Sequence, residues 1–259
     1  MIIDAHSHLG WSEIFSAGIT EELLMGTMAA NEIDVTMVMP AAGAEPRATH
    51  DAIAELSERE AGRVFGIASI PPLLGEEFYV RELRRCVEEL GFKAVKLHPQ
   101  AHATSPVLPV ADVVFRTAAE LGIPVMVHTG TGAPFALPSL LIRRAREYPD
   151  LKIILAHAGF AVYSEEAIIA AEVCDNIYLE PSWCLAGDIG KMVRLLGPDR
   201  VMYGGDLPYN VPIELAKPEA CGLNADEKEW FFWRSARNVF DLPIPDSAGS
   251  STDVSKGDR

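Results

Sequence analysis

Histidine and aspartate residues recur in this sequence directly after short apolar runs, a placement that suits metal chemistry. His6 and His8 are two residues apart, so both side chains point to the same side of a strand, as two ligands of one ion must. The other members of the set each follow a later run: His98, His128, His157 and Asp206. Imidazole and carboxylate groups bind Zn²⁺ and other borderline divalent metals, and a site of three or four such ligands leaves room for water or substrate.

The apolar runs alternate with longer stretches that have helical spacing. The runs lie at residues 1–5, 35–39, 64–68, 94–97, 124–127, 152–155, 176–179 and 200–203. The helical stretches lie at residues 21–31, 50–61, 77–90, 111–121, 137–147, 165–173, 189–196 and 226–239. Near-continuous apolar strands indicate burial on both faces, as in a parallel sheet covered by helices.

This alternation predicts an α/β protein, a (β/α)₈ TIM barrel in one domain. Eight βα units fit a chain of this length, and Gly91, Gly122 and Gly197 each follow a helical stretch and precede a strand. The alternative is a doubly wound open sheet, which usually has fewer strands and a glycine-rich first turn. Here the first run ends in His-Ser-His instead, which favours the barrel.

In a barrel the carboxyl ends of all strands meet at one mouth, so the strand-end side chains converge there. Closure places the last strand beside the first, which brings Asp206 next to His6 and His8, with His128 on the opposite wall. A single strand-end histidine is more often a hydrogen-bonded core residue than a ligand. The combination favours a metal site, because buried polar groups without partners are costly.

Charge and composition exclude several classes of partner. The 259 residues carry 22 Lys+Arg against 37 Asp+Glu, a formal net charge of −15. Nucleic acids and anionic membrane surfaces require a basic footprint, so neither is expected as a partner. The expected partner is a small-molecule substrate; the sequence leaves the oligomeric state open, with a homodimer as the working expectation.

The remaining features predict a cytoplasmic protein with one domain and a tail. The cysteines are scattered, which suggests reduced thiols: Cys86, Cys174, Cys184 and Cys221. Neither a secretory signal nor an apolar stretch long enough to span a membrane is visible. We expect the barrel to occupy residues 1–242 and residues 243–259, rich in Pro, Ser, Gly and Asp, to form a disordered tail.

The motifs around these histidines resemble the amidohydrolase superfamily and, within it, the amidohydrolase-2 branch of hydrolases and nonoxidative decarboxylases. The matching segments are Asp4-Ala5-His6-Ser7-His8, Val127-His128-Thr129-Gly130, Leu155-Ala156-His157-Ala158-Gly159 and Tyr203-Gly204-Gly205-Asp206. The resemblance implies a barrel with His6, His8, His128 and Asp206 around one metal ion, commonly zinc. It also implies that His157 lies near the metal and polarises the substrate.

Lys96 and His98 share one face of the fourth strand and are candidate substrate-binding residues. In binuclear members of the superfamily a lysine of the fourth strand is carbamylated and bridges two metals. The resemblance therefore implies that Lys96 could hold a second ion, since burial lowers the pKa of a lysine and makes its amine reactive. The alternative is a lysine paired with a neighbouring acid.

Three further residues are candidates for substrate binding. Glu180 ends the seventh strand, Trp183 follows it and could form a pocket wall, and Arg47 follows the second strand and could bind a carboxylate. Local hydrogen bonding, a loop anchor and a solvated helix start are the respective alternatives. His50 and His102 are assigned no role.

The sequence thus predicts a metal-dependent hydrolase of a small amide, ester or lactone. A metal-activated water would attack, with Asp206 as the proton carrier and His157 stabilising charge on the carbonyl oxygen. The alternative is a nonoxidative decarboxylase of an aromatic or enoic acid, and a non-catalytic metal-binding barrel is a third reading. The short connection at residues 10–20 favours the hydrolase, because decarboxylases of the family carry larger insertions there.

Overall fold

A ring of parallel strands forms the centre of the protein. The computed structural model describes residues 1–14, 16–43 and 45–245. Its strands are β1 (Ile3–Ser12), β2 (Ala17–Ile19), β3 (Val35–Pro40), β4 (Val64–Ser69), β5 (Ala94–Leu97), β6 (Val125–His128), β7 (Ile153–Ala156) and β8 (Ile177–Glu180). From β1 through β3 to β8 each strand pairs in parallel with the next, and β2 pairs antiparallel with the end of β1.

A short extended segment after β8 closes the ring. Val201 forms a parallel bridge to Leu179, and Ala5 of β1 donates its backbone N–H to Tyr203 O at 3.0 Å. This segment is therefore the eighth strand of the barrel, as the apolar run at residues 200–203 predicts. The expectation of a (β/α)₈ barrel in one domain is confirmed.

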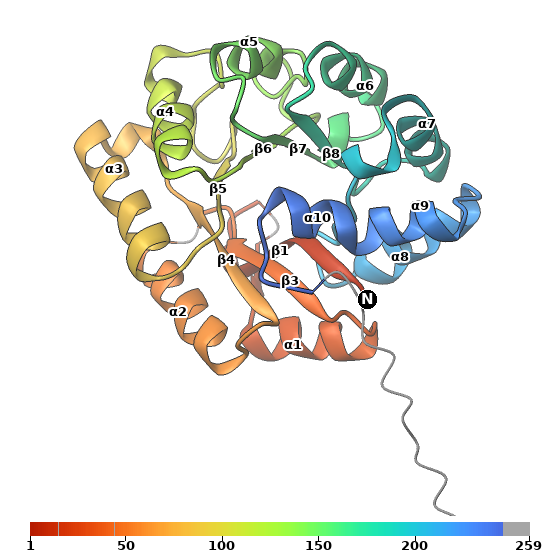
Figure 1. Cartoon of the computed structure of the whole chain (residues 1–259). Coiled ribbons are helices and arrows are strands. Elements are labelled where there is room, and N and C mark those ends of the chain that lie inside the picture. Colours follow the sequence, from red (N-terminus) through yellow and green to blue (C-terminus); the bar gives the residue numbers. More distant parts are fainter. Residues whose placement is uncertain (15, 44, 246–259) are drawn as a thin grey trace, which may run out of the picture.

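Helices surround the ring of strands (Figure 1). They are α1 (Glu21–Ala30), α2 (Pro46–Arg59), α3 (Glu76–Arg84), α4 (Asp112–Leu121), α5 (Leu140–Glu147), α6 (Ser164–Val173), α7 (Ala186–Leu196), α8 (Val211–Ala220), α9 (Ala225–Glu229) and α10 (Ser235–Val239). Two π-helical turns, η2 (Arg85–Glu89) and η6 (Trp230–Arg234), continue α3 and join α9 to α10. Of the tail expected at residues 243–259, residues 246–259 lie outside the described residues, and Ile244 is buried against the barrel.

The sequence analysis missed helix α8. Its first turn contains Pro212 and its last turn contains Pro218, a residue type that is unfavourable inside helices. Proline is tolerated in the first helical turn, where its missing N–H would have no partner anyway. Pro218 falls close enough to the end at Ala220 for the helix to stop soon afterwards.

The C-terminal residues close one end of the barrel. Trp233, Val239, Phe240 and Leu242 belong to the same buried cluster as the side chains that fill the barrel interior, among them Met37. In Figure 1, α10 accordingly crosses the centre of the ring of strands. The carboxyl ends of the strands, at the opposite end, are left to hold a ligand.

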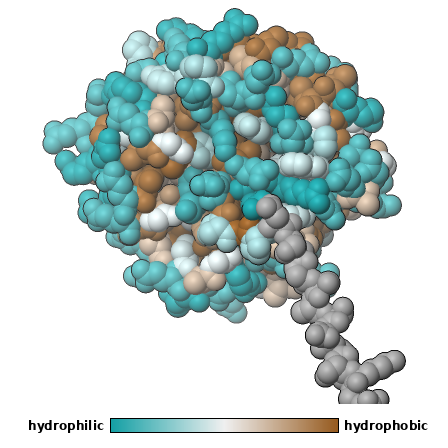
Figure 2. Space-filling view, viewed as in Figure 1, coloured by the Kyte–Doolittle hydropathy of each residue, from teal (hydrophilic) through white to brown (hydrophobic). Residues whose placement is uncertain are grey.

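The outer surface mixes hydrophilic and apolar residues. In Figure 2, which has the same view as Figure 1, hydrophilic residues predominate over the outer helices and apolar patches lie between them. Within the described residues, no helix combines the length and the apolar character needed to span a bilayer.

A buried polar cluster joins α2 to α3. His50 Nδ1 lies 3.0 Å from Glu82 Oε1 and 3.3 Å from Cys86 Sγ, and all three side chains are buried. Arg85 donates to both oxygens of Glu82, at 2.7 and 3.0 Å. Burial raises the pKa of the Cys86 thiol above its usual range, so this group stays protonated. With a guanidinium on the carboxylate and no thiolate, the cluster is a structural network and a poor metal site.

Two glycines provide a matched test of the packing. A Cβ added to Gly66 of β4 would lie 2.4 Å from the ring of the buried Phe92, whereas one added to the exposed Gly26 of α1 would meet nothing within 4 Å. We expect Gly66→Ala to lower the free energy of unfolding by about 1–3 kcal/mol through overpacking. Gly26→Ala is expected to raise it by up to about 1 kcal/mol. Urea denaturation measures both, and equal stabilities would contradict the packing at Gly66.

Glu82 gives the barrel a pH-dependent contribution to stability. Burial alone would raise the pKa of Glu82, but hydrogen bonds from His50 and Arg85 lower it from 4.5 to about 2. The ionised group therefore stabilises the fold above pH 4.5, and this stabilisation is lost as the pH falls toward 2. We expect Glu82→Gln to unfold more easily than the parent at pH 7, with a smaller difference at pH 3 in urea titrations. A difference independent of pH would contradict this.

Candidate metal centre

Most of the predicted site residues line one cavity at the carboxyl ends of the strands. Its volume is about 560 Å³. The predicted residues that line it are His6, His8, Lys96, His98, His128, His157, Trp183 and Asp206. The strand-end rule therefore brings together eight of the ten predicted residues, and Glu180 and Arg47 lie elsewhere.

His6, His8 and Asp206 form a group of possible metal ligands in this cavity. Their ligand atoms lie within 4.8 Å of one another, with Asp206 Oδ1 3.5 Å from His6 Nε2 and 3.0 Å from His8 Nε2. Trp183 donates its indole N–H to the other oxygen of Asp206 at 2.7 Å. The carboxylate is thereby turned so that Oδ1 faces the two imidazoles.

The opposite ring nitrogens of both histidines already have acceptors. His6 Nδ1 lies 2.6 Å from Glu180 Oε2, and His8 Nδ1 lies 3.4 Å from the carbonyl oxygen of Pro40. A carboxylate or carbonyl next to Nδ1 favours a proton there and leaves the lone pair on Nε2. Two nitrogen lone pairs and one carboxylate oxygen then face a common point, an arrangement that fits a divalent metal ion.

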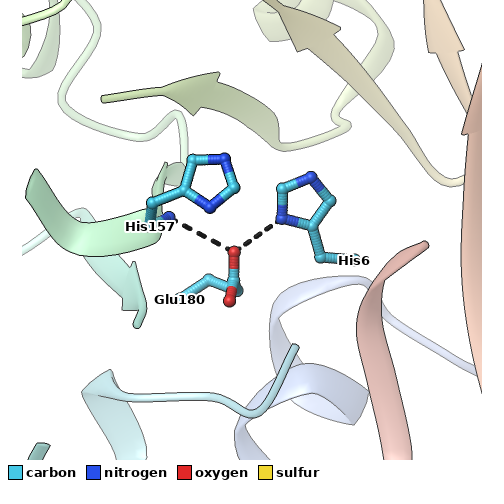
Figure 3. Close-up of side chains that lie close together, drawn as sticks. All are labelled: His6, His157 and Glu180. Carbon is cyan, nitrogen blue, oxygen red and sulfur yellow. Dashed lines mark hydrogen bonds and ion pairs between the residues drawn. The ribbon is translucent and has the colours of Figure 1, made fainter. Parts of the chain in front are cut away.

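Glu180 lies behind this group and does not line the cavity. Its side chain is fully buried, and one oxygen accepts both from His6 and from the backbone N–H of His157, the latter at 3.3 Å (Figure 3). Ser182 donates its backbone N–H to the other oxygen at 2.8 Å. The expectation that Glu180 lines the mouth is corrected: its oxygens are occupied by the protein, so it orients His6.

Two adjacent glycines allow buried acids to approach the eighth strand. A Cβ on Gly204 would lie 2.5 Å from Glu180 Oε1, and one on Gly205 would lie 2.8 Å from Asp4 Oδ2. Asp4 accepts the backbone N–H groups of His6 and Gly205, at 3.0 and 2.9 Å. The sequence analysis gave Asp4 no role, although an acid inside a buried strand was the available signal. It ties the first strand to the eighth.

His128 and His98 form a second, separate pair of imidazoles. Their rings are stacked, with centroids 4.2 Å apart and an angle of 10° between the planes. His128 Nε2 lies 3.0 Å from the carbonyl oxygen of Thr131, so this nitrogen carries the proton. The buried Nδ1 of the same ring has no hydrogen-bond partner among the described residues. His128 is outside the His6–His8–Asp206 group, yet its unpaired nitrogen is one that a metal or a ligand would satisfy.

The charge states suit metal binding. Burial lowers the pKa of His6 and of His157 well below the ordinary value, and it lowers that of His128 to about 4, so these rings are neutral. Burial opposes ionisation of Asp206, yet its pKa lies well below the usual range. Neutral imidazoles with an ionised carboxylate are the forms that bind a metal.

Lys96 supplies a buried positive charge to the cavity. Its Nζ lies 3.1 Å from His6 Nε2, and its side chain is 2% exposed. Burial lowers the pKa of Lys96 to about 8, whereas Asp206 and Glu180 act to raise it. Among the described residues that line the cavity there is no arginine.

Arg47 is not among the residues that line the cavity. Its guanidinium lies on α2, is half exposed, and approaches Glu82 at 3.7 Å. The expectation that Arg47 binds substrate is corrected on this basis, because Glu82 of α3 attracts it to the outer layer of helices.

Apolar residues that the sequence analysis did not select complete the cavity. Ile14 and Ile19 come from the β1–β2 hairpin, Leu207 follows the eighth strand, and Phe160 follows β7. Phe160 stacks on Trp183 with ring centroids 5.6 Å apart and planes at 11°. A phenylalanine is as common in a protein core as in a binding site, so its residue type alone did not identify Phe160. The turn after β7 brings it to the mouth of the cavity.

Backbone strain is concentrated at the same site. His157, Trp183 and Asp206 have φ values of 64°, 67° and 61°. Left-handed backbone costs non-glycine residues about 1–3 kcal/mol each and persists where the surroundings enforce it, often at functional sites. His157 is held in this geometry by Ser182, whose Oγ lies 2.8 Å from His157 Nδ1.

Solved structures with this fold include several enzymes that act on acids. The crystal structure of 2,6-dihydroxybenzoate decarboxylase from Rhizobium matches with a TM-score of 0.75 at 17% identity, over 93% of this chain and 98% of that chain. The 5-carboxyvanillate decarboxylase from Novosphingobium aromaticivorans, crystallised with manganese and 4-hydroxy-3-methoxy-5-nitrobenzoic acid, matches at 0.74 with 19% identity, over 93% and 96%. The 4-oxalomesaconate hydratase from Rhodopseudomonas palustris matches at 0.70 with 18% identity, over 93% and 96%.

These structures show the fold, and the decarboxylases are matched over nearly their whole length despite the short connection at residues 10–20. No curated protein matches the sequence. The sequence profile of the amidohydrolase family Amidohydro_2 matches residues 3–242. Since this match covers nearly the whole barrel, the chain belongs to the amidohydrolase family and is a metal-dependent enzyme.

Proposed function

We propose that this enzyme is a nonoxidative decarboxylase of an aromatic or enoic acid. The observation that carries the proposal is the cavity itself, where the buried ammonium of Lys96 lies beside the His6–His8–Asp206 group and apolar side chains form the remaining walls. A cation at the inner end suits a carboxylate, and the stacked rings of Phe160 and Trp183 suit a flat apolar body. The decarboxylases with the same fold support this choice.

The residues proposed to hold the metal are His6, His8 and Asp206, with His128 as a fourth ligand. A bound divalent ion would polarise the oxygens of the acid and stabilise the electron pair left when CO₂ departs. A carbamate on Lys96, which would form from the neutral amine and carry a negative charge, and a second ion are not required by this arrangement.

The residues that line the cavity then have distinct roles in the reaction. Lys96 neutralises the carboxylate, and the apolar walls exclude water from it. Asp206, ionised in this site, takes a proton from water or from a hydroxyl of the acid and delivers it to the carbon that loses CO₂, so a C–H bond forms there as the C–C bond to CO₂ breaks. His157, fixed by Ser182, faces the cavity as a neutral donor or acceptor for a substrate oxygen.

Hydrolysis of an amide, ester or lactone is the second candidate. The observation that favours it is the ionised Asp206 beside neutral imidazoles, because the same carboxylate could take a proton from an attacking water. The two functions share the metal ligands and differ in the substrate bond that breaks.

Metal content tests the ligand assignment directly. We expect His6→Ala/His8→Ala to purify without stoichiometric metal, because two of the nitrogen ligands are lost. His98→Ala, which changes another cavity histidine, should retain metal. Elemental analysis of dialysed protein measures both, with circular dichroism as the control for folding.

His128 is tested in the same series. We expect His128→Ala to bind the ion more weakly than the parent in competition with a chelator, by about tenfold or more. Unchanged affinity would remove His128 from the ligand set, and stoichiometric metal in the His6/His8 double variant would contradict the site as a whole.

The reaction is tested by product analysis of protein loaded with zinc or with manganese. We expect CO₂ release from hydroxybenzoic or enoic acids, with Asp206→Asn slower by about 10²–10⁴-fold because the proton carrier is lost. Lys96→Met should raise KM for the acid more than Lys96→Arg does. Turnover of lactones, esters or amides without CO₂ release would establish hydrolysis and contradict the proposal.

A further inference from the structure

The His98 side chain has one defined tautomer and one unused hydrogen-bonding group. Its Nδ1 accepts the backbone N–H of Ala101 at 3.3 Å. A nitrogen that accepts carries no proton, so the proton of the neutral ring is on Nε2. No hydrogen bond joins Nε2 to any described residue, and the ring lines the cavity. His98 therefore presents an unpaired N–H donor to whatever occupies the cavity.

A second histidine holds the backbone of His98. His102 Nδ1 accepts the backbone N–H of His98 at 3.2 Å, and the backbone N–H of His102 donates to His98 O at 2.8 Å. Because Nδ1 of His102 is an acceptor, its proton is on Nε2, which lies 3.3 Å from Ser69 Oγ. The buried imidazole of His102 thus holds the turn at residues 98–102 in place.

The same chain of hydrogen bonds continues to the outer helices. Ser69 donates its backbone N–H to His50 Nε2 at 3.0 Å, which places the proton of His50 on Nδ1, facing Glu82 at 3.0 Å. His50 is fully buried and His102 is 6% exposed. Each imidazole accepts at one nitrogen and can donate at the other, so the network has one consistent set of proton positions from Glu82 to His98.

We propose that His98 donates its Nε2–H to a second oxygen atom of the substrate, and that His102, Ser69 and His50 position this donor. The proposal rests on the proposed function and adds a requirement to it: the acid must carry a hydroxyl, phenolate or carbonyl oxygen apart from the carboxylate that reacts. An apolar acid without such an oxygen would leave the N–H unsatisfied.

The position of His98 in the cavity indicates which end of the substrate it contacts. Neighbouring ring centroids lie 5.1 Å apart from His8 to His6, 4.9 Å from His6 to His157, 4.8 Å from His157 to His128 and 4.2 Å from His128 to His98. His98 is the last ring of this series, and the His6–His8–Asp206 group is at its start. The second oxygen therefore lies beside His128, at the other end of this series of rings from His8.

The tautomer is tested on metal-free protein, which separates it from the reaction. Long-range ¹H–¹⁵N correlation of histidine-labelled protein above pH 7 should show His98 with its proton on Nε2. His102→Asn keeps an acceptor near the position of Nδ1 and should preserve this spectrum, whereas His102→Gln removes that acceptor and should give mixed tautomers. Ser69→Ala, a small change that leaves the backbone N–H to His50 intact, should broaden the His102 signals.

The spectra can overturn the proposal in two ways. A His98 proton on Nδ1 in the parent protein would contradict the donor. An unchanged His98 tautomer in His102→Gln, or unchanged His102 signals in Ser69→Ala, would contradict the positioning role. Unfolding midpoints of the variants control for loss of the fold. If His102→Gln fails to fold, the parent spectrum still tests the His98 tautomer, and the Ser69→Ala spectrum still tests the positioning role.

The substrate requirement is tested on the metal-loaded enzyme. Among acids that release CO₂, we expect those with a ring hydroxyl or a second carbonyl to lose about tenfold in kcat/KM in His98→Leu, mainly through KM. His98→Gln, whose amide can donate near the position of Nε2, should recover part of the loss. Equal losses for acids with and without the second oxygen would overturn the assignment. Absence of CO₂ release from every acid would instead overturn the proposed function and leave the tautomer result standing.

Discussion

The site depends on the closure of the barrel. Asp206 donates its backbone N–H to His6 O at 2.7 Å, and Ala5 donates to Tyr203 O at 3.0 Å, so the last strand lies against the first. These bonds join residues about 200 positions apart in the sequence, and they place a carboxylate beside two imidazoles that a single strand provides. If the ring were open, as in a doubly wound sheet, the first and last strands would not be neighbours.

Closure of the barrel also buries two acidic side chains behind the histidines, which is unfavourable unless hydrogen bonds compensate it. Asp4 and Glu180 are both fully buried, and burial raises the pKa of each to about 7. Such groups need many hydrogen bonds to stay in the interior, and backbone N–H groups of His6, Gly205, His157 and Ser182 provide them. Glycine at positions 204 and 205 leaves the space for this approach. The acids and the glycines are parts of one arrangement that orients His6 and joins the strands.

The positions of the metal-binding candidates could be predicted from the sequence, because a parallel strand sends its last side chains to the same end as its neighbours. His6, His8 and Asp206 follow this rule directly. What the rule does not contain is the orientation of each side chain about its strand. Glu180 and His157 follow adjacent strands, yet one is behind the cavity and the other lines it, because the register between β7 and β8 decides which face points inward.

The misplaced and overlooked residues have a common physical origin in the segments that follow the strands. Arg47 belongs to α2, whose helical geometry directs it to Glu82. Phe160 reaches the mouth because the residues from His157 to Ala161 all have left-handed backbone conformations. Residue types other than glycine rarely adopt this conformation, so the sequence does not predict it. His102 obtains its place from contacts with Ser69 and His98, residues of two different strand ends, and pairwise contacts of this kind cannot be read from periodicity.

The charge balance inside the cavity connects the fold to the proposed chemistry. Lys96 Nζ lies 3.1 Å from the His6 nitrogen that faces Asp206. At an effective dielectric constant of about 20, two like unit charges about 4 Å apart repel by about 4 kcal/mol, and a divalent ion would double this. An ammonium and a metal ion can share this buried space only if anionic groups lie between them. Asp206 supplies one such charge, and the carboxylate of an acid substrate would supply the second. A neutral amide or lactone would leave part of the repulsion uncompensated, so the position of Lys96 itself favours an anionic substrate.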